Sequence, residues 1–247
     1  MQAQAVFLDL DGTLLNYGDA DWAATVRAVC AIVCRPGDGP EDRVDPEDLF
    51  ASYTRISSTY FRAAEASHEQ VSDGHAIWRG LWWQALAECG CTDRAMTDTA
   101  VAAYAADRAA RYELFSDVLP TLALLRERVS SLVLITNGPG STQRHKADAT
   151  GLTSLLDAVI ISGEVGTAKP DPAIFELAAQ AAGVAPAAAW HVGDSLASDV
   201  AGARNASLGA GVWLNRGAVA YPGARDPATA RPHHEIVTLA ELPGLLS

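Results

Sequence analysis

The chain has 247 residues, a length that fits one large domain or two small ones. Apolar residues make up 49% and charged residues 19%, which is typical of a globular chain. No apolar run reaches the roughly 18 residues that a membrane span needs, and the formal net charge of −12 disfavours a nucleic-acid partner. A strand-like run begins at Ala5 and leaves no room for a signal peptide, so we expect a cytoplasmic protein.

The first predicted element is a short buried strand at 5–8, followed by an Asp-x-Asp-Gly motif. Residues two apart on a strand point the same way, so we expect the carboxylates of Asp9 and Asp11 to project together, while Gly12 lets the chain turn. Two carboxylates this close repel each other, which favours a cation beside them. The pair could serve as nucleophile and general acid/base; the alternative is a solvated turn, because Asp-Gly is a common turn dipeptide.

The next stretch, 16–115, carries no clear strand pattern and favours several helices, at roughly 20–34, 46–68, 74–89 and 95–112. It holds all four cysteines of the chain, Cys30, Cys34, Cys89 and Cys91. We expect them to pack as small buried apolar residues and not to form a metal or redox site. Trp78 and Trp82 fall on one helical face. They could form an aromatic wall for a base or sugar ring, but we favour packing inside the helical insert.

The remainder of the chain alternates helices and strands. Helices are expected at 117–129, 139–150, 171–182 and after Ser195, and strands at 132–135, 158–161, 189–192 and 211–214. Continuous apolar strands separated by helices indicate an α/β fold, a Rossmann-like parallel sheet with helices on both faces. We therefore expect two domains, the Rossmann-like core at 1–15 and 116–247 and the inserted all-helical domain at 16–115.

Polar residues follow the predicted strands, where open parallel sheets bind ligands. Thr136 and Asn137 come after the second strand and precede a helix that begins at Pro139. A helix N-terminus suits an anion, and an ordinary helix cap is the alternative interpretation. The basic cluster at 144–146 in this helix could reach a second anionic group of a substrate, but we expect it to form an exposed helix face.

Lys169 stands just before the following helix, where a fixed cation could neutralise a phosphoryl group. Asp194 follows the strand at 189–192, where a hard cation would need another oxygen ligand. Asp199 lies about one helical turn into the next helix and could support Lys169 or the water molecules around a metal. His191 suggests no role, and we interpret it as a sheet residue with a satisfied imidazole.

In this order and context the motifs resemble the haloacid dehalogenase superfamily, specifically its phosphatase branch with a helical cap. The resemblance covers 5–15 and 117–215 motif by motif, and the helical insert only in position and character. The Thr-Asn-Gly motif with Gln143 and Lys146 downstream, and the Gly-rich segment at 163–166, are similar to one subgroup of that branch. It holds the nucleoside-monophosphate phosphatases and the N-acylneuraminate-9-phosphate phosphatases.

The resemblance implies a role for each motif residue. Asp9 would be the nucleophile that takes the phosphoryl group as an aspartyl-phosphate. Asp11 would protonate the leaving oxygen and then activate the water that releases phosphate. Thr136 and the Asn137 backbone would hold phosphoryl oxygens, and Lys169 would neutralise charge on the nucleophile and the transferring group. Positioning and neutralisation are what phosphoryl transfer mainly requires of a protein.

The resemblance also implies a Mg²⁺ site formed by the Asp9 carboxylate, the Asp11 backbone carbonyl and Asp194, with Asp199 at the family's supporting acidic position. The expected function is Mg²⁺-dependent hydrolysis of a small phosphorylated metabolite, with a nucleotide or a sugar phosphate favoured. The cations of such a site would offset the acidic charge of the chain. The expected partner is therefore a small-molecule phosphate ester, with no nucleic acid and no membrane.

Three other functions fit parts of the pattern. A haloacid dehalogenase of the same fold resembles the chain but lacks the second aspartate of the first motif, which is present here as Asp11. A phosphomutase shares the nucleophile and the acid, and differs in whether the cap holds a sugar phosphate for return transfer or admits water. A non-catalytic regulatory protein tends to lose its nucleophile or metal ligands first, whereas all of these positions are filled here.

Overall fold

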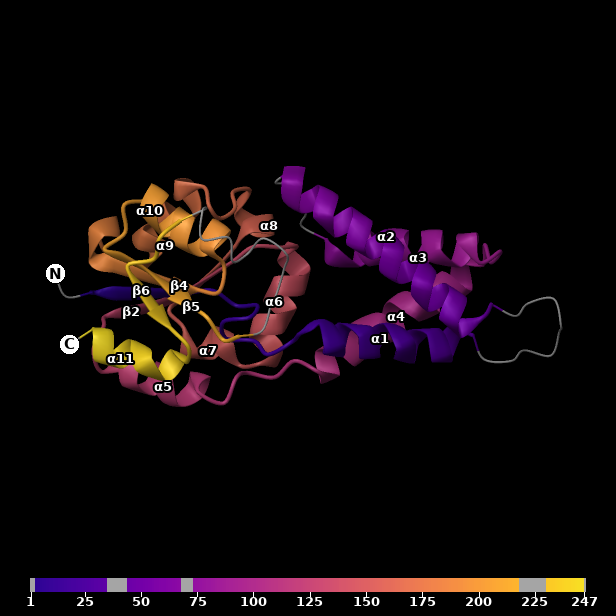
Figure 1. The fold of residues 1–247 in the computed structure, drawn as a ribbon, viewed down its shortest axis with the longest axis horizontal. Helices are drawn as coiled ribbons and strands as arrows, with labels where there is room; N and C mark the ends of the chain where they lie inside the picture. Colours follow the sequence, from indigo (N-terminus) through magenta and orange to yellow (C-terminus); the bar gives the residue numbers. More distant parts are fainter. Residues whose placement is uncertain (1–2, 35–43, 68–72, 218–229, 247) are drawn as a thin grey trace. The chain divides into compact units, whose positions relative to one another are not determined.

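The computed structural model describes residues 3–34, 44–67, 73–217 and 230–246. The chain forms two compact units, each with its own elements (Figure 1). We call Met1–Gly18 together with Tyr112–Ser247 the core unit, and Asp19–Arg111 the helical unit. Among the described residues, no helix is long and apolar enough to cross a membrane.

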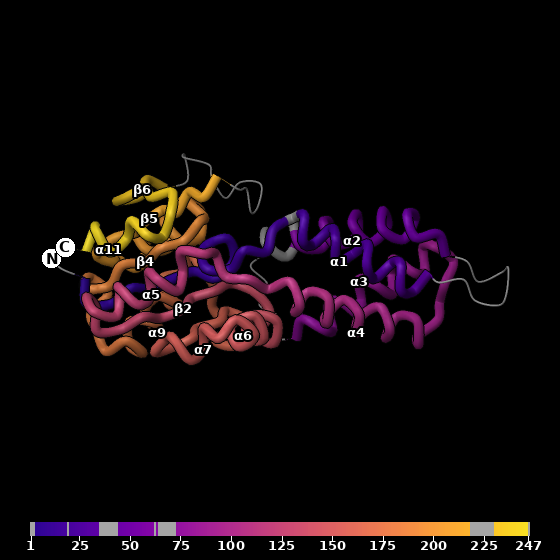
Figure 2. Tube along the Cα trace, turned by 90° about the horizontal axis from the view of Figure 1, so that it is seen from below, coloured from indigo at the N-terminus to yellow at the C-terminus, as the bar shows by residue number. Residues whose placement is uncertain are grey.

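The core unit is built on a six-stranded sheet with the spatial order β3-β2-β1-β4-β5-β6. All neighbouring strands are parallel, and Figure 2 shows β6, β5, β4 and β2 one below the other. The strands are β1 (Ala5–Leu8), β2 (Ser131–Thr136), β3 (Ala158–Ile161), β4 (Ala189–Gly193), β5 (Ala210–Leu214) and β6 (His234–Ile236). The parallel sheet predicted from the sequence is confirmed. The structure adds the edge strand β6, whose His-Glu-Ile sequence is too short and polar to show a strand pattern.

Helices cover both faces of the sheet because successive strand residues point to opposite sides. Val6 and Leu8 belong to one buried cluster, with side chains of α5 (Val118–Arg126) and α11 (Leu242–Leu245). Ala5 and Phe7 belong to another, with side chains of α9 (Pro172–Ala182) and α10 (Ala201–Asn205). Figure 1 shows these two pairs of helices on opposite sides of the strands. The predicted three-layer α/β arrangement is confirmed.

The remaining helical segments of the core unit follow strand ends or precede strands. They are α6 (Gly140–Ala149), α7 (Leu152–Leu155), α8 (Ser162–Val165), η1 (Pro186–Ala188), η2 (Leu196–Val200) and η3 (Leu239–Glu241). Ser195 caps the turn that follows β4, since its side chain accepts a hydrogen bond from the Ser198 backbone N–H. The first turn after this cap is a wide π-turn, in which the Val200 N–H donates to the Ser195 carbonyl. This turn places Asp199 near the end of β4.

The helical unit consists of four helices: α1 (Asp19–Val33), α2 (Pro46–Ser67), α3 (Gly74–Glu88) and α4 (Arg94–Ala110). Its core is aromatic. The rings of Tyr53 and Trp82 stack with centroids 3.9 Å apart, and Trp78 meets Tyr104 edge-on. Trp78 and Trp82 are both buried in this cluster, as the packing interpretation predicts. All four cysteines are free, and burial raises the pKa of Cys30 to about 12, which makes it an unreactive thiol.

A partly buried ion pair ties three distant parts of the core unit together. The Arg216 guanidinium donates two hydrogen bonds of 2.9 Å to the Asp117 carboxylate and one of 3.0 Å to the Thr13 carbonyl. Asp117 also accepts from the Thr238 hydroxyl at 2.6 Å and from the Leu239 N–H at 2.8 Å. Burial acts to raise the pKa of Asp117, but these donors outweigh it and lower the pKa below its ordinary value. One carboxylate thus links α5, the loop after β1 and the segment after β6.

Replacing Asp117 with alanine is expected to lower the free energy of unfolding by about 2–3 kcal/mol, because the partly buried Arg216 would lose its charged partner and the Thr238 and Leu239 donors would lose their acceptor. Urea denaturation of the purified protein measures this loss. The matched control is Glu164→Ala, which removes a half-exposed partner of Arg144 and should cost less than about 1 kcal/mol. Equal losses of unfolding free energy in the two variants would show that the Asp117–Arg216 pair stabilises the fold no more than the Arg144–Glu164 pair does.

Candidate active site

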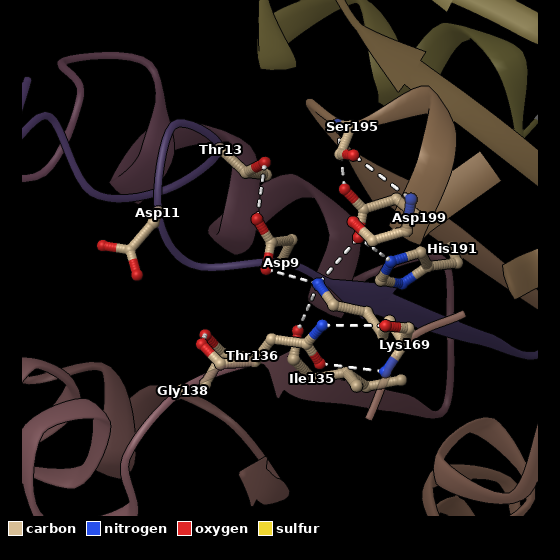
Figure 3. A network of polar contacts seen from close by, with 12 residues as sticks. Asp9, Asp11, Thr13, Ile135, Thr136, Gly138, Lys169, His191, Ser195 and Asp199 are labelled. Carbon is tan, nitrogen blue, oxygen red and sulfur yellow. Dashed lines mark hydrogen bonds and ion pairs between the residues drawn. The ribbon is translucent and has the colours of Figure 1, made fainter. Parts of the chain in front are cut away.

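Residues from three neighbouring strands meet at the carboxyl edge of the sheet (Figure 3). Asp9 follows β1, Thr136 is the last residue of β2, and Asp194 follows β4. Strand β1 lies between β2 and β4 in the sheet, so the ends of these strands are adjacent. The strand-end residues predicted from the sequence are therefore brought to one place by the strand order.

Lys169 is the centre of the site. Its side-chain nitrogen Nζ lies 2.5 Å from Asp9 Oδ1, 2.7 Å from Asp199 Oδ1 and 3.1 Å from the Ile135 carbonyl oxygen. Asn137 fixes the Lys169 backbone from both sides: its Nδ2 donates to the Lys169 carbonyl, and its Oδ1 accepts from the Lys169 N–H, both at 2.9 Å. Desolvation acts to lower the pKa of Lys169, but the two carboxylates outweigh it and raise the pKa above its ordinary value. The ammonium group is thus a permanent charge in a buried site.

Asp9 is almost fully buried beside this ammonium group. Its Oδ2 accepts a 3.4 Å hydrogen bond from the Thr13 hydroxyl. Burial raises the pKa of Asp9 to about 7; Lys169 lowers it, while the Asp199 and Asp11 carboxylates raise it further. One lysine therefore compensates only part of the negative charge around Asp9.

Asp194 completes an acidic group with Asp9 and Asp199, in which the nearest oxygens all lie within 4.8 Å of one another. Burial, followed by the charges of Asp9 and Asp199, raises the pKa of Asp194 to about 8. The chain passes close by at Gly12, where φ is +76° and an added Cβ would lie 2.5 Å from Asp194 Oδ2. Among the described residues, no hydrogen bond to the Asp194 carboxylate is found, so its oxygens are available to a ligand.

The donor set of Asp9 and Asp194 fits a hard divalent cation. Both side chains offer carboxylate oxygens, the ligands that Mg²⁺ and Ca²⁺ prefer, and both have raised pKa values that a nearby cation would lower. Asp199 is already engaged, because its oxygens contact Lys169, the His191 ring and the Ser195 N–H. Asp199 is thus better suited to orient Lys169 than to bind a metal.

Without metal, the protein is expected to lose stability as the pH rises from about 6.5 to 8.5. The folded state binds protons at Asp9 and Asp194 with pKa values of about 7 and 8, against 3.8 ordinarily, so the unfolded state binds fewer protons in this window and stability falls with pH. His191 has a lowered pKa and acts in the opposite direction, but only below its ordinary value of 6.5. Asp199, whose pKa lies below 3.8, adds no slope here.

Thermal denaturation in EDTA should show this fall as a decrease of a few degrees in Tm, and Mg²⁺ at pH 8.5 should restore Tm. The control is Asp194→Asn, which removes both a buried charge and a metal ligand. In that variant the decrease should be smaller and the response to Mg²⁺ lost. A Tm that is flat over this window and indifferent to Mg²⁺ in the unchanged protein would contradict the proposed cation site.

His191 is a member of the site that the sequence interpretation missed. Its Nε2 lies 2.9 Å from Asp199 Oδ1 in a fully buried position, a contact with the site that the sequence pattern did not indicate. His191 and Gly193 share one face of β4. An added Cβ at Gly193 would lie 2.2 Å from Asp199 Cγ, so Asp199 packs directly on that face. The histidine-x-glycine pattern before Asp194 was the signal that could have revealed the contact.

Asp11 does not project together with Asp9, contrary to expectation. Figure 3 shows its carboxylate pointing away from the Lys169 cluster. Strand β1 ends at Leu8, and the chain turns at Gly12, so the alternation of a strand does not extend to Asp11. Its carboxylate instead accepts hydrogen bonds from Lys146 and Gln143. Lys146 was expected on an exposed helix face, but its side chain is buried.

Comparisons with known proteins identify the family of this chain. The family model for haloacid dehalogenase-like hydrolases matches residues 3–207. The chain is 29% identical to the N-acylneuraminate-9-phosphatase of Homo sapiens over 99% of this chain and 94% of that protein. It is 41% identical to the phosphoserine phosphatase of Thermus thermophilus over 86% of this chain and 88% of that protein.

A solved structure supports the fold. The magnesium-bound haloacid dehalogenase hydrolase YfnB of Bacillus subtilis matches with a TM-score of 0.72 over 100% of both chains, at 21% identity. The match to the family model extends over most of this chain and includes all the residues of the site described above. The chain belongs to the haloacid dehalogenase-like hydrolase family, within which it is a phosphatase.

Proposed function

We propose that the protein is a Mg²⁺-dependent phosphomonoesterase that works through an aspartyl-phosphate at Asp9. The observation that carries the proposal is the buried Lys169 ammonium, 2.5 Å from Asp9 Oδ1. A carboxylate beside a permanent cation can approach a phosphate dianion that it would otherwise repel. The acidic chain thus carries its own positive charge at the point where a phosphoryl group would arrive.

The reaction would proceed in two displacements at phosphorus. In the first, an Asp9 oxygen forms a bond to phosphorus, the ester oxygen–phosphorus bond breaks, and Asp11 gives a proton to the leaving alcohol. In the second, a water molecule attacks the same phosphorus, Asp11 takes its proton, and the bond to Asp9 breaks to release phosphate. Asp9 and Asp11 end in their starting states, so atoms and charges balance over the cycle.

The phosphoryl oxygens would be held by Thr136 and the Asn137 backbone, at the end of β2. This point lies before the N-terminus of α6, where the helix dipole gives a partial positive charge that suits an anion. Asp9, Asp194 and the Asp11 backbone carbonyl would hold Mg²⁺, which would supply charge neutralisation to the dianion. Asp199 and His191 would orient Lys169 without touching the substrate.

Asp11 also bears on the choice between chemistries. Hydrolysis of a carbon–halogen bond releases halide and needs no proton donor, whereas the release of an alcohol does. Two buried donors, Lys146 and Gln143, hold the Asp11 carboxylate in place. The presence of a second aspartate at this position therefore supports phosphate ester hydrolysis over dehalogenation.

The substrate is expected to be a small phosphate ester, with a nucleotide or sugar phosphate favoured. The relatives include enzymes named for an N-acylneuraminate 9-phosphate and for phosphoserine. We propose that the helical unit acts as the cap that selects the leaving group. The aromatic residues Trp78 and Trp82 are engaged in packing, so other side chains of the helical unit would have to recognise the leaving group of the substrate.

Phosphate release from a panel of esters in the presence of Mg²⁺ tests the function. The panel contains nucleoside monophosphates, sugar phosphates, phosphoglycolate, phosphoserine and N-acylneuraminate 9-phosphate, with the Asp9→Asn protein as control. One ester that is hydrolysed far faster than the others would identify the substrate. Absence of any activity above the control would overturn the proposal, and exchange between sugar bisphosphates would then test for a mutase.

A further inference from the structure

Helix α6 presents two buried polar side chains to Asp11. Lys146 Nζ lies 2.7 Å from Asp11 Oδ1 and 2.8 Å from Oδ2, and Gln143 Nε2 lies 2.8 Å from Oδ2. Gln143 is 2% exposed and Lys146 is 5% exposed. We infer that these two residues are positioning residues for the reaction, which fix the acid/base carboxylate of Asp11 relative to the transferring phosphoryl group. The inference rests on the proposed function.

The Lys146 ammonium and the Gln143 amide destabilise the fold when buried, unless each finds a hydrogen-bond partner. A buried ammonium or amide must be matched by acceptors, and apolar residues on this face of α6 would pack without that requirement. Only two of the 18 basic residues of the chain are lysines, Lys146 and Lys169, and both are buried. Each contacts one aspartate of the Asp-x-Asp motif: Lys169 contacts Asp9, and Lys146 contacts Asp11. A single ammonium group contacts both oxygens of Asp11 and so limits rotation of the carboxylate.

Gln143 links the acid to the phosphate-binding residue. Its Nε2 donates one hydrogen to Asp11 Oδ2 and the other to the Thr136 hydroxyl, which lies 2.6 Å away. Because the Thr136 oxygen accepts this bond, its own hydrogen must point elsewhere, and the protein acceptor found for it, the Asn137 carbonyl, is 3.5 Å away. The threonine is thereby prepared to donate to a phosphoryl oxygen. Gly138 makes room for the arrangement, since an added Cβ would lie 3.1 Å from Gln143 Cγ.

The arrangement suits an in-line transfer. The nucleophile and the leaving oxygen stand on opposite sides of phosphorus, so the proton donor has to be separated from Asp9. Lys146 and Gln143 hold Asp11 turned away from Asp9, as Figure 3 shows for the Asp11 side chain. The effective concentration of a catalytic group depends on such preorganisation, and small misplacements are costly.

The test compares two leaving groups in the Lys146→Met protein. Protonation by Asp11 matters for an alkyl phosphate, whose alcohol leaves poorly, and hardly matters for p-nitrophenyl phosphate, whose phenolate leaves well. We expect kcat/KM for the alkyl phosphate to fall by about 10- to 100-fold, with a fall of less than about 3-fold for p-nitrophenyl phosphate. Gln143→Leu should show the same selectivity and should also weaken inhibition by inorganic phosphate, since Thr136 loses its partner. An equal fall for both esters, or no fall, would overturn the inference.

The matched control is Arg144→Met, which removes a cation from the same helix. Arg144 pairs with Glu164 and touches none of the site residues described here, so both esters should be hydrolysed as before. Lys146→Met should also add nothing to Asp11→Asn, because the lysine acts through that carboxylate. An additive loss would contradict the inference. The proposed function fails separately, if the unchanged protein shows no hydrolysis above Asp9→Asn.

Discussion

Replacing Asp9 with asparagine is expected to lower kcat by about 10⁴-fold or more with every phosphate ester. The amide occupies the same volume and can keep a contact with the Thr13 hydroxyl, but it is not a nucleophile and carries no negative charge. No alternative carboxylate can replace it, since Asp11 is held by α6 and Asp199 is held by Lys169 and His191. Single-turnover measurement of phosphate release, in protein checked for an unchanged circular dichroism spectrum, gives the size of the loss.

A stability measurement distinguishes loss of the nucleophile from loss of the fold. Asp9 is buried with a raised pKa, so the carboxylate is costly to keep in the metal-free protein. Asp9→Asn should therefore unfold in EDTA at a Tm no lower than that of the unchanged protein at pH 8.5. Hydrolysis within about 10-fold of the unchanged enzyme would exclude Asp9 as the nucleophile. A loss of kcat accompanied by a much lower Tm would instead show that Asp9 is needed for folding.

Much of the site follows from the order of strands and of motifs. Asp9, Thr136 and Asp194 were placed at strand ends from apolar runs alone, and β1, β2 and β4 are neighbours in the sheet. Once parallel strands are expected, their carboxyl ends must lie at one edge. Asp199 was expected to support either Lys169 or the water molecules around a metal, and its Oδ1 lies 2.7 Å from Lys169 Nζ. The roles of these residues in catalysis stay predictions.

Other features depend on side-chain direction, which a one-dimensional pattern does not contain. Lys146 and Gln143 look like ordinary polar residues of α6, and only the turn at Gly12 brings Asp11 to them. His191 reads as one more residue of an apolar strand, and only the wide turn after Ser195 brings Asp199 against it. Each missed contact joins two elements through a loop whose path the sequence pattern leaves open.

Lys169 is the residue on which the charges of the site depend, and its replacement by methionine is expected to change both stability and turnover. The thioether fills a similar space, but Asp9 and Asp199 would remain as two buried carboxylates with no ammonium between them. The free energy of unfolding at pH 7 should fall by about 3–5 kcal/mol. Asp199→Asn in the same chain should recover part of this loss, because it removes one of the two repelling charges.

Turnover by Lys169→Met should fall by about 10²- to 10³-fold, when assayed well below the Tm of the variant. The pH dependence identifies the cause. Lys169 lowers the pKa of Asp9, which is about 7 when the lysine is present, so without it Asp9 holds its proton to higher pH. The acidic limb of kcat/KM should then move upward, and the variant should regain part of its activity as the pH rises. A loss of the same size at every pH would mean that Lys169 acts on the phosphoryl group and not on the nucleophile.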